Sequence, residues 1–402
     1  MLSAPVLLQY LIAAACTTAE GTLLLVYAPY LDGYGYALPT IGTLSALVNV
    51  FRLVSRVPVG AAYRPARARR QLVLWLLVFT AATSGFAFAD GSLPVVVLLT
   101  VIHGFAFGAL GTINLAVVID LTEGRRAGAT MGLYTAALST GYSLGAFAGG
   151  AVSDALGIPA AVAIIGALPA LAVPLVLVLP ALAAQPHVLE HGPGLGGLWR
   201  AHRDLDVRVW LAFVIVLYIN LVSDAVDTFF ALYGLAIGLP LAATGALKGI
   251  KSGAATFIRF ISAGVFRYVD HRAVNFWGVI LMGAATFAVP LLGGVFAALA
   301  VAFFVAGICR GLLRVTSAAM VAELRAEGRN VGVASGVYNA GLDIGGIIGP
   351  LLAGVVADAI GLAPMFQVIA AGSVLAYLAV ALSSGRTRAA LGLGDPRARG
   401  TS

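Results

Sequence analysis

The chain has 402 residues, of which 60% are hydrophobic and 10% charged, and its mean hydropathy is +1.00. This composition excludes a water-soluble enzyme or binding domain, because it leaves too few polar residues to cover a soluble surface, and it predicts an integral membrane protein. The net charge of +7 comes almost entirely from arginine, since the chain contains only two lysines.

Twelve apolar segments are long enough to cross a bilayer as helices. A span needs about 20 apolar residues. Segments of this kind lie at 5–31, 38–60, 71–89, 94–118, 129–152, 159–182, 208–235, 241–266, 273–292, 295–320, 332–356 and 363–383. The first begins almost at Met1 with no cleavage site after it, so we expect it to be retained.

Connections that contain arginine alternate along the chain with connections that contain no Lys or Arg. Arg64 follows the second span and Arg125 the fourth, for example. Cytoplasmic connections carry the excess of basic residues. Both termini and the segment 183–207 are therefore predicted to be cytoplasmic, and the basic charge gives no reason to expect a nucleic acid as partner.

An internal repeat relates the two halves of the chain. Residues 131–157 match residues 335–361, 204 positions later. Identical positions in the first copy include Gly132, Tyr134, Gly141, Gly145, Gly150, Asp154 and Gly157. Six spans separate the copies, and this even number makes them parallel repeats.

The repeat predicts an all-α integral membrane fold of twelve helices in two pseudo-symmetric six-helix bundles. We expect the bundles at 1–182 and 208–383, joined by a cytoplasmic linker at 183–207. The tail at 384–402 is rich in Arg and Gly and is expected to lack fixed structure.

With this repeat the chain resembles the major facilitator superfamily, whose members rock two six-helix bundles about a central cavity. The fifth span has a glycine series that is similar to the antiporter signature of proton-coupled drug exporters in that superfamily. The series is Gly132, Gly141, Gly145, Ala146, Gly149 and Gly150, with Ala146 in place of the usual proline. In the eleventh span the copy has the proline, as Pro350.

The glycine series predicts a close approach of helices, because glycine lets two helix backbones meet. We expect these residues to pack and pivot at the interface between the bundles. The residues assigned to this role are Gly141, Gly145, Gly149, Gly345, Gly349 and Pro350. A tight packing seam without a role in coupling is the alternative.

Seven cations lie inside the apolar segments, where a charge is costly and usually functional. They are Arg52, Arg56, Lys248, Lys251, Arg259, Arg310 and Arg314. Arg56 and Arg314 lie nearer the cytoplasmic end, where we expect them to snorkel toward water.

The eighth span carries a cationic stripe. Lys248 and Lys251 are three residues apart, and Arg259 returns to within about 20° of the direction of Lys248. Asp224 and Asp227 form a matching pair in the seventh span at about the same depth. An acid–base ladder between the seventh and eighth spans is therefore expected.

Two further acidic residues lie within spans. Asp343 is near the centre of the eleventh span, at the depth of Arg310, so these two are expected to lie close together. Glu20 has no cation nearby in sequence and is the candidate for binding a proton. In the fourth span His103 lies where many proton-coupled exporters carry an arginine, and we expect it to be a satisfied polar group.

These residues give two sets of candidates for the transport site. The candidates for proton coupling are Glu20, Asp224, Asp227 and Asp343. The candidates for substrate binding are Lys248, Lys251, Arg259, Arg310, Arg52, Asn114, Tyr134, Tyr338 and Asn339. Interior cations outnumber interior acids, so an anionic or zwitterionic small molecule is the expected substrate.

Three hypotheses follow for the function. The first is a proton-coupled antiporter that exports a small amphiphilic or anionic compound. The second is an organic-anion exchanger or uptake carrier that uses the eighth-span cations without protons. The third is a sensor or intramembrane enzyme, for which the chain shows no catalytic motif and no nucleotide-binding loop.

No cofactor and no metal site are expected, because Cys16 and Cys309 lie in separate spans and no ligand cluster is evident. We expect a monomer with a small-molecule substrate, protons and the lipid bilayer as partners. The bias toward Ala and Gly favours a bacterial inner membrane as the location.

Overall fold

The computed structural model of the chain is helical throughout. It describes residues 3–122, 127–180, 206–266, 270–326, 331–391 and 393. Within these ranges the chain forms helices and turns and no β-strand. The linker predicted at 183–207 lies almost wholly outside the described residues, as does most of the predicted tail.

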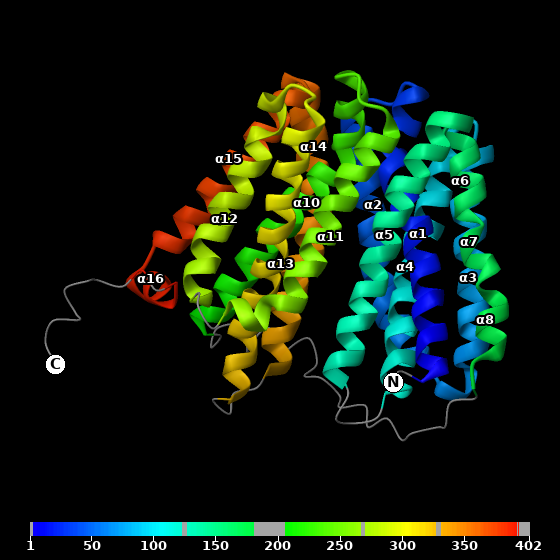
Figure 1. Cartoon of the computed structure of the whole chain (residues 1–402), viewed down its shortest axis with the longest axis horizontal. Coiled ribbons are helices and arrows are strands. Elements are labelled where there is room, and N and C mark those ends of the chain that lie inside the picture. Colours follow the sequence, from blue (N-terminus) through cyan, green and yellow to red (C-terminus); the bar gives the residue numbers. More distant parts are fainter. Residues whose placement is uncertain are drawn as a thin grey trace, which may run out of the picture.

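Six helical passes form the N-terminal bundle (Figure 1). They are α1 (Ala4–Gly33), α2 (Leu38–Ala62), η1 and α3 (Pro65–Arg67, Ala68–Gly85) with η2 (Phe86–Phe88), α4 (Leu93–Asp120), α5 (Ala127–Leu156), and the three pieces α6 (Ile158–Gly166), α7 (Leu168–Leu171) and α8 (Val173–Val178).

The sixth pass is broken because of its prolines. Pro159, Pro169 and Pro174 each lie in the first turn of one of the three pieces. A proline lacks the N–H that would continue the hydrogen-bond ladder of the preceding helix, so one predicted span becomes three short helices.

Six passes also form the C-terminal bundle, which lies beside the first (Figure 1). They are α10 (Val207–Ala236), α11 (Leu241–Val265), α12 (His271–Ala288) with η5 (Val289–Leu292), α13 (Phe296–Ala326), α14 (Val331–Ile360) and α15 (Leu362–Leu382). A further short helix, α16 (Gly385–Ala390), lies in the tail that was expected to lack structure. It is followed by Leu391, which is buried in the core of this bundle.

Ten of these passes are long and apolar enough to cross a membrane. The other two, α5 and α11, are of similar length but less apolar, because α5 is rich in glycine and α11 carries Lys248, Lys251 and Arg259. Together they complete the twelve spans that the sequence predicts.

The internal repeat is visible in the backbone. Gly157 and Gly361 occupy matched positions before α6 and α15, with φ of 88° and 93° and ψ of 159° and 162°. Such a positive φ strongly favours glycine. The two copies therefore make the same turn with the same residue.

The two ends of the bundle differ in their connections. We call the end that holds both termini and the arginine-bearing connections the basic side. The other end, which holds the connections around residues 34–37, 86–92, 237–240 and 293–295, is called the opposite side.

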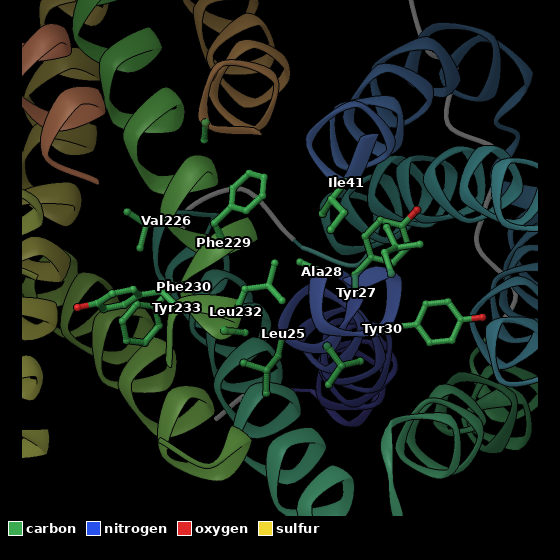
Figure 2. Packing of buried hydrophobic residues seen from close by; sticks show 14 of the residues in the cluster. Leu25, Tyr27, Ala28, Tyr30, Ile41, Val226, Phe229, Phe230, Leu232 and Tyr233 are labelled. Atoms are coloured by element: carbon green, nitrogen blue, oxygen red, sulfur yellow. The ribbon is translucent and has the colours of Figure 1, made fainter. Parts of the chain in front are cut away.

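The apolar core joins the two bundles near the opposite side. One cluster of buried residues contains side chains from both, among them Leu25 and Tyr27 of α1 and Phe229 and Phe230 of α10 (Figure 2). The remaining clusters among the described residues belong to a single bundle each. The bundles therefore share a core at the opposite side and have separate cores toward the basic side.

Close backbone contacts between the bundles show the same asymmetry. A Cβ on Gly150 would overlap the Leu241 carbonyl, and one on Gly245 would overlap the Ala146 carbonyl, both near the opposite side. Toward the basic side, a Cβ on Gly249 would meet Ser143 only at 3.6 Å, and one on Gly253 would meet nothing within 4 Å. The backbones of α5 and α11 are thus closest near the opposite side, and toward the basic side the two helices meet through side chains, such as Phe260 against Gly132.

Candidate functional site

A cavity of about 210 Å³ lies between the two bundles, near the middle of the helices. Helices of both bundles line it, so it is the central cavity that the two-bundle architecture predicts. Its charged and titratable lining residues are Glu20, Arg52, His103, Asp224, Asp227, Lys248, Lys251 and Arg310.

In the N-terminal bundle the cavity is lined by a cluster around Glu20. An Nη2 of Arg52 donates to Oε1 of Glu20 at 2.5 Å, and Nε2 of His103 lies 2.7 Å from Oε2. The side chains of Glu20 and His103 are 4% and 1% exposed. The Arg52 guanidinium also lies over the ring of Phe107 at 4.6 Å. Glu20 thus has two partners, Arg52 and His103, which the sequence did not predict.

The hydrogen bonds around His103 determine which of its nitrogens carries a proton. The Thr83 hydroxyl donates to the carbonyl of Phe79 at 2.8 Å, as Thr often does within a helix. When the hydroxyl donates there, its oxygen is left to accept from Nδ1 of His103, 3.0 Å away. With Nδ1 protonated, the contact between Nε2 and Glu20 needs one more proton, carried either by the carboxyl group or by an imidazolium. In this protonation state the Glu20–His103 contact binds one proton, which can exchange.

In the C-terminal bundle the predicted ladder between α10 and α11 is found at Asp227. Nζ of Lys251 donates to Oδ1 of Asp227 at 2.6 Å. Nζ of Lys248 donates to the carbonyl of Asp227 at 2.7 Å and to the carbonyl of Leu24, in α1, at 3.0 Å. Lys248 thus links the ladder to the other bundle.

Two charged groups in the cavity lack a direct partner. Asp224 and Arg310 make no hydrogen bond or ion pair through their side chains within the described ranges, and Nε of Arg310 is buried. Unpaired charges in a cavity are available to a ligand.

The expected Arg310–Asp343 pair is not observed in the part of the chain that the structure describes. Asp343 is instead bonded to Arg56 at 3.0 Å. The pair forms because α2 packs along α14, which brings Arg56 of one bundle against Asp343 of the other. Asp343 therefore lies at the junction between the bundles.

The remaining candidates for substrate binding lie outside the cavity lining. Asn114 is buried and accepts a hydrogen bond from Gln9 at 2.6 Å. Tyr134 packs against Tyr10, whereas Tyr338 is partly buried with its hydroxyl 3.4 Å from Ser317 Oγ. Asn339 is exposed in α14. Arg259 lies on α11, toward the basic side of the cavity.

Five of the six residues assigned to the interface between the bundles pack within a bundle instead. A Cβ on Gly141 or Gly145 would overlap a carbonyl of α1, in the same bundle, and Gly149 faces the side chain of Thr22. Gly345 and Gly349 pack in the same way on carbonyls of α10. Gly141, Gly145 and Gly149 therefore tighten the pair of α1 with α5, and Gly345 and Gly349 tighten the pair of α10 with α14. The other members of the fifth-span series, Gly132, Ala146 and Gly150, face α11 of the other bundle.

Other glycines make the close contacts between the bundles. Gly150 and Gly245 bring α5 against α11, as described above, and Gly42 faces the Pro350 carbonyl where α2 meets α14. Of the residues assigned to the interface from sequence, Pro350 is thus found there.

A comparison with protein families agrees with this architecture. The family profile described as Major Facilitator Superfamily matches residues 10–296 and 266–399. The chain belongs to the major facilitator superfamily. Its members are secondary transporters.

Solved structures of this superfamily share the fold over nearly the whole chain. A bacterial homolog of the human lysosomal transporter Spinster, solved in an inward-facing and unoccupied conformation, has a TM-score of 0.73, 14% identity, and coverage of 97% of this chain and 96% of that one. The nucleoside transporter NupG has a TM-score of 0.75, 15% identity, and coverage of 94% and 99%. At these identities the likeness shows the fold alone.

A curated relative matches a smaller part of the chain. An uncharacterized superfamily transporter of Schizosaccharomyces pombe, C18.02, is 27% identical over 118 residues. The match covers 29% of this chain and 26% of that relative. The match supports the family assignment, and the name of the relative gives no substrate.

Within this superfamily fold, sequence reasoning missed His103 and Thr83 as parts of the site. The one signal was the position of His103, in the fourth span, where many proton-coupled exporters carry an arginine. Thr83 gave no signal, because a threonine within an apolar helix usually bonds only to its own backbone.

Proposed function

We propose that the chain is a proton-coupled antiporter that exports a small organic compound, anionic or amphiphilic, by alternating access. The observation that carries the proposal is the contact between Glu20 and His103, which holds one shared proton when Nδ1 of His103 is protonated and lies in the same cavity as the cations of α11 and α13. A proton site and a substrate site in one cavity are what an antiporter needs, because each ligand must be able to displace the other.

In the described form the bundles pack most closely at the opposite side, where they also share an apolar core. If the basic side is cytoplasmic, as the positive-inside rule predicts, this form faces inward. An organic anion would enter from the cytoplasm and meet Lys248, Lys251 and Arg310 in the cavity.

Substrate binding can be coupled to rocking of the bundles through Lys248. An anion that binds the α11 lysines competes with Asp227 for Lys251. It also competes with the Leu24 carbonyl for Lys248, and that bond connects the two bundles. Loss of this link would favour the outward-facing form.

The proton acts on the other wall of the cavity. When it leaves, the Glu20 carboxylate and the Nε2 lone pair of His103 face each other at 2.7 Å without a hydrogen between them, which is repulsive. Glu20 then keeps Arg52 as its partner and must move away from His103. Proton release therefore reorganises the α1–α2–α4 wall.

The alternative is an organic-anion exchanger or uptake carrier that needs no proton. The observation that favours it is the charge of the cavity lining, in which four cations (Arg52, Lys248, Lys251 and Arg310) face three acids (Glu20, Asp224 and Asp227). Transport under a pH gradient separates the two functions.

The test is transport in proteoliposomes that contain a pH-sensitive dye, with a panel of small organic anions and amphiphiles. We expect the parent protein to move protons against the substrate, Glu20→Gln to lose the response to the gradient, and Lys248→Ala to lose substrate transport. Arg388→Gln, on exposed α16, is the matched control and should behave as the parent. Gradient-independent exchange that survives Glu20→Gln would replace the antiporter with the anion exchanger.

A further inference from the structure

Three arginines of the C-terminal bundle lack a counter-ion. Arg259 of α11 and Arg310 and Arg314 of α13 make no ion pair and no hydrogen bond through their guanidinium groups within the described parts of the chain. Nε of Arg259 and Nε of Arg310 are buried without a partner. Two acids of the same bundle are already paired, Asp227 with Lys251 and Asp343 with Arg56.

The three arginines form one cluster because α11 and α13 run parallel and in contact. A Cβ on Gly307 would overlap the carbonyl of Lys251, and one on Gly311 would approach the carbonyl of Ala255 at 2.7 Å. Gly307 thus lies against Lys251 and Gly311 against Ala255, and one helical turn further along both helices the same alignment places Arg259 beside Arg314. Arg310 and Arg314 both act electrostatically on Arg259, with the same sign of charge.

The cluster extends from the cavity toward the basic side. Arg310 lines the cavity, and Arg314 is one turn further along α13. Arg259 is eight residues beyond Lys251, which is about 12 Å along the helix. At this level the two bundles have separate apolar cores, and a Cβ on Gly253 would meet nothing within 4 Å. The arginines thus lie where a ligand would pass.

The charge of the cluster sets the charge of its ligand. Asp224 is the unpaired carboxylate that acts on Arg314. Three positive charges against this one negative charge leave an excess of two. Guanidinium groups also present planar pairs of donors, which match phosphate and carboxylate oxygens. We infer that Arg259, Arg310 and Arg314 bind the anionic group of the transported compound between the basic side and the cavity, and that this group is a dianion of the phosphate monoester type.

This inference rests on the proposed transport function for the route of the ligand, but its test does not depend on proton coupling. The protein is purified in a neutral detergent, and its thermal unfolding is followed with methyl phosphate or methyl sulfate at constant ionic strength. At about pH 8 a phosphate monoester is doubly charged, whereas methyl sulfate has the same shape and one charge. Methyl phosphate should raise the unfolding temperature more than methyl sulfate does.

Variants locate the binding. Arg259→Gln and Arg314→Gln should each weaken the apparent affinity for methyl phosphate about tenfold or more, the loss expected for a hydrogen bond to a charged group. Arg259→Lys and Arg314→Lys keep the positive charge, so they can be tested if the Arg→Gln variants do not fold. They should weaken the affinity for methyl phosphate by a smaller factor. Arg388→Gln should leave the affinity unchanged.

Three results would overturn the inference. The first is no stabilisation by methyl phosphate, and the second is equal stabilisation of the parent and the Arg→Gln variants. The third is stabilisation by phosphatidylglycerol in mixed micelles without an effect of methyl phosphate, which would make the cluster a lipid site. None of these results bears on the response of transport to a pH gradient, which is measured separately. The anion site and the proton-coupled antiporter can therefore fail independently.

Discussion

Glu20 has two partners that respond differently to a proton. Arg52 remains charged throughout, whereas His103 can bond to Glu20 only when a proton lies between them. His103 needs this extra proton because the Thr83 hydroxyl, by accepting from Nδ1, keeps the proton of the neutral imidazole on that nitrogen and away from Glu20. In the proposed proton site, a residue that does not line the cavity would thus control how tightly the proton is held.

Replacing Thr83 with valine tests this role. Without the hydroxyl, neutral His103 can carry its proton on Nε2 and donate to ionised Glu20, so the deprotonated pair is no longer repulsive. The proton is then held less tightly, and the midpoint of pH-dependent transport should move to lower pH. A hydrogen bond contributes about 1 kcal/mol, and one pH unit corresponds to about 1.4 kcal/mol, so the shift should approach one unit.

The control is Thr286→Val, which removes a buried hydroxyl that bonds to the Met282 carbonyl in the C-terminal bundle. This variant should keep the midpoint of the parent. An unchanged midpoint in Thr83→Val, with normal protein yield, would show that Thr83 does not fix the tautomer of His103.

At this scale the sequence predicted one pair between neighbouring helices, placed Asp224 in a ladder where it makes no bond to the described residues, and missed the pairs between distant helices. The Lys251–Asp227 pair was predictable, because consecutive antiparallel spans meet and the two residues lie at equal depth. Glu20 with His103, and Arg56 with Asp343, join helices that are far apart in the chain. Depth along a span does not say which of the many other helices it faces.

The glycine series acts at the scale of helix pairs. Gly141 and Gly145 face carbonyls of α1, and Gly345 and Gly349 face carbonyls of α10, so the repeat builds the same tight pair in each bundle. The sequence predicted a close approach correctly, but the resemblance alone could not assign the partner helix. The breaks in the sixth pass could have been expected from its three prolines.

Adding one methyl group to this series should destabilise the protein. Gly145→Ala would place its Cβ on the Thr18 carbonyl, and backbone cannot give way as a flexible side chain can. Overpacking of this kind costs about 1–3 kcal/mol, so the unfolding temperature of the purified protein should fall. Gly253→Ala is the matched control, because its Cβ meets nothing within 4 Å. An equal response of the two variants would contradict the packing argument.

For the molecule as a whole, the closed end has an asymmetry that the repeat does not predict. Asp154, at the end of α5, accepts hydrogen bonds from the backbone N–H groups of Leu241 and Ala242 at 3.0 and 2.8 Å, and so caps α11 of the other bundle. Its repeat mate Asp358 lies near the start of α2, where Pro39 has no N–H to donate. Asp358 is exposed and makes no bond to the residues that the structure describes.

Closure at the opposite side should therefore depend on Asp154 and not on Asp358. A helix cap contributes about 1 kcal/mol, and Asp154→Ala removes one that exists only while α5 and α11 touch. The population opened at this side should rise about fivefold, which is what 1 kcal/mol gives at room temperature. Spin labels on exposed Asp32 of α1 and Leu235 of α10 report the opening as a longer distance, in a background that lacks Cys16 and Cys309. Asp358→Ala, with the same loss of charge at the matched position, should leave the distance distribution as in the parent. If both variants opened the protein equally, the effect would come from the lost charge and not from the cap.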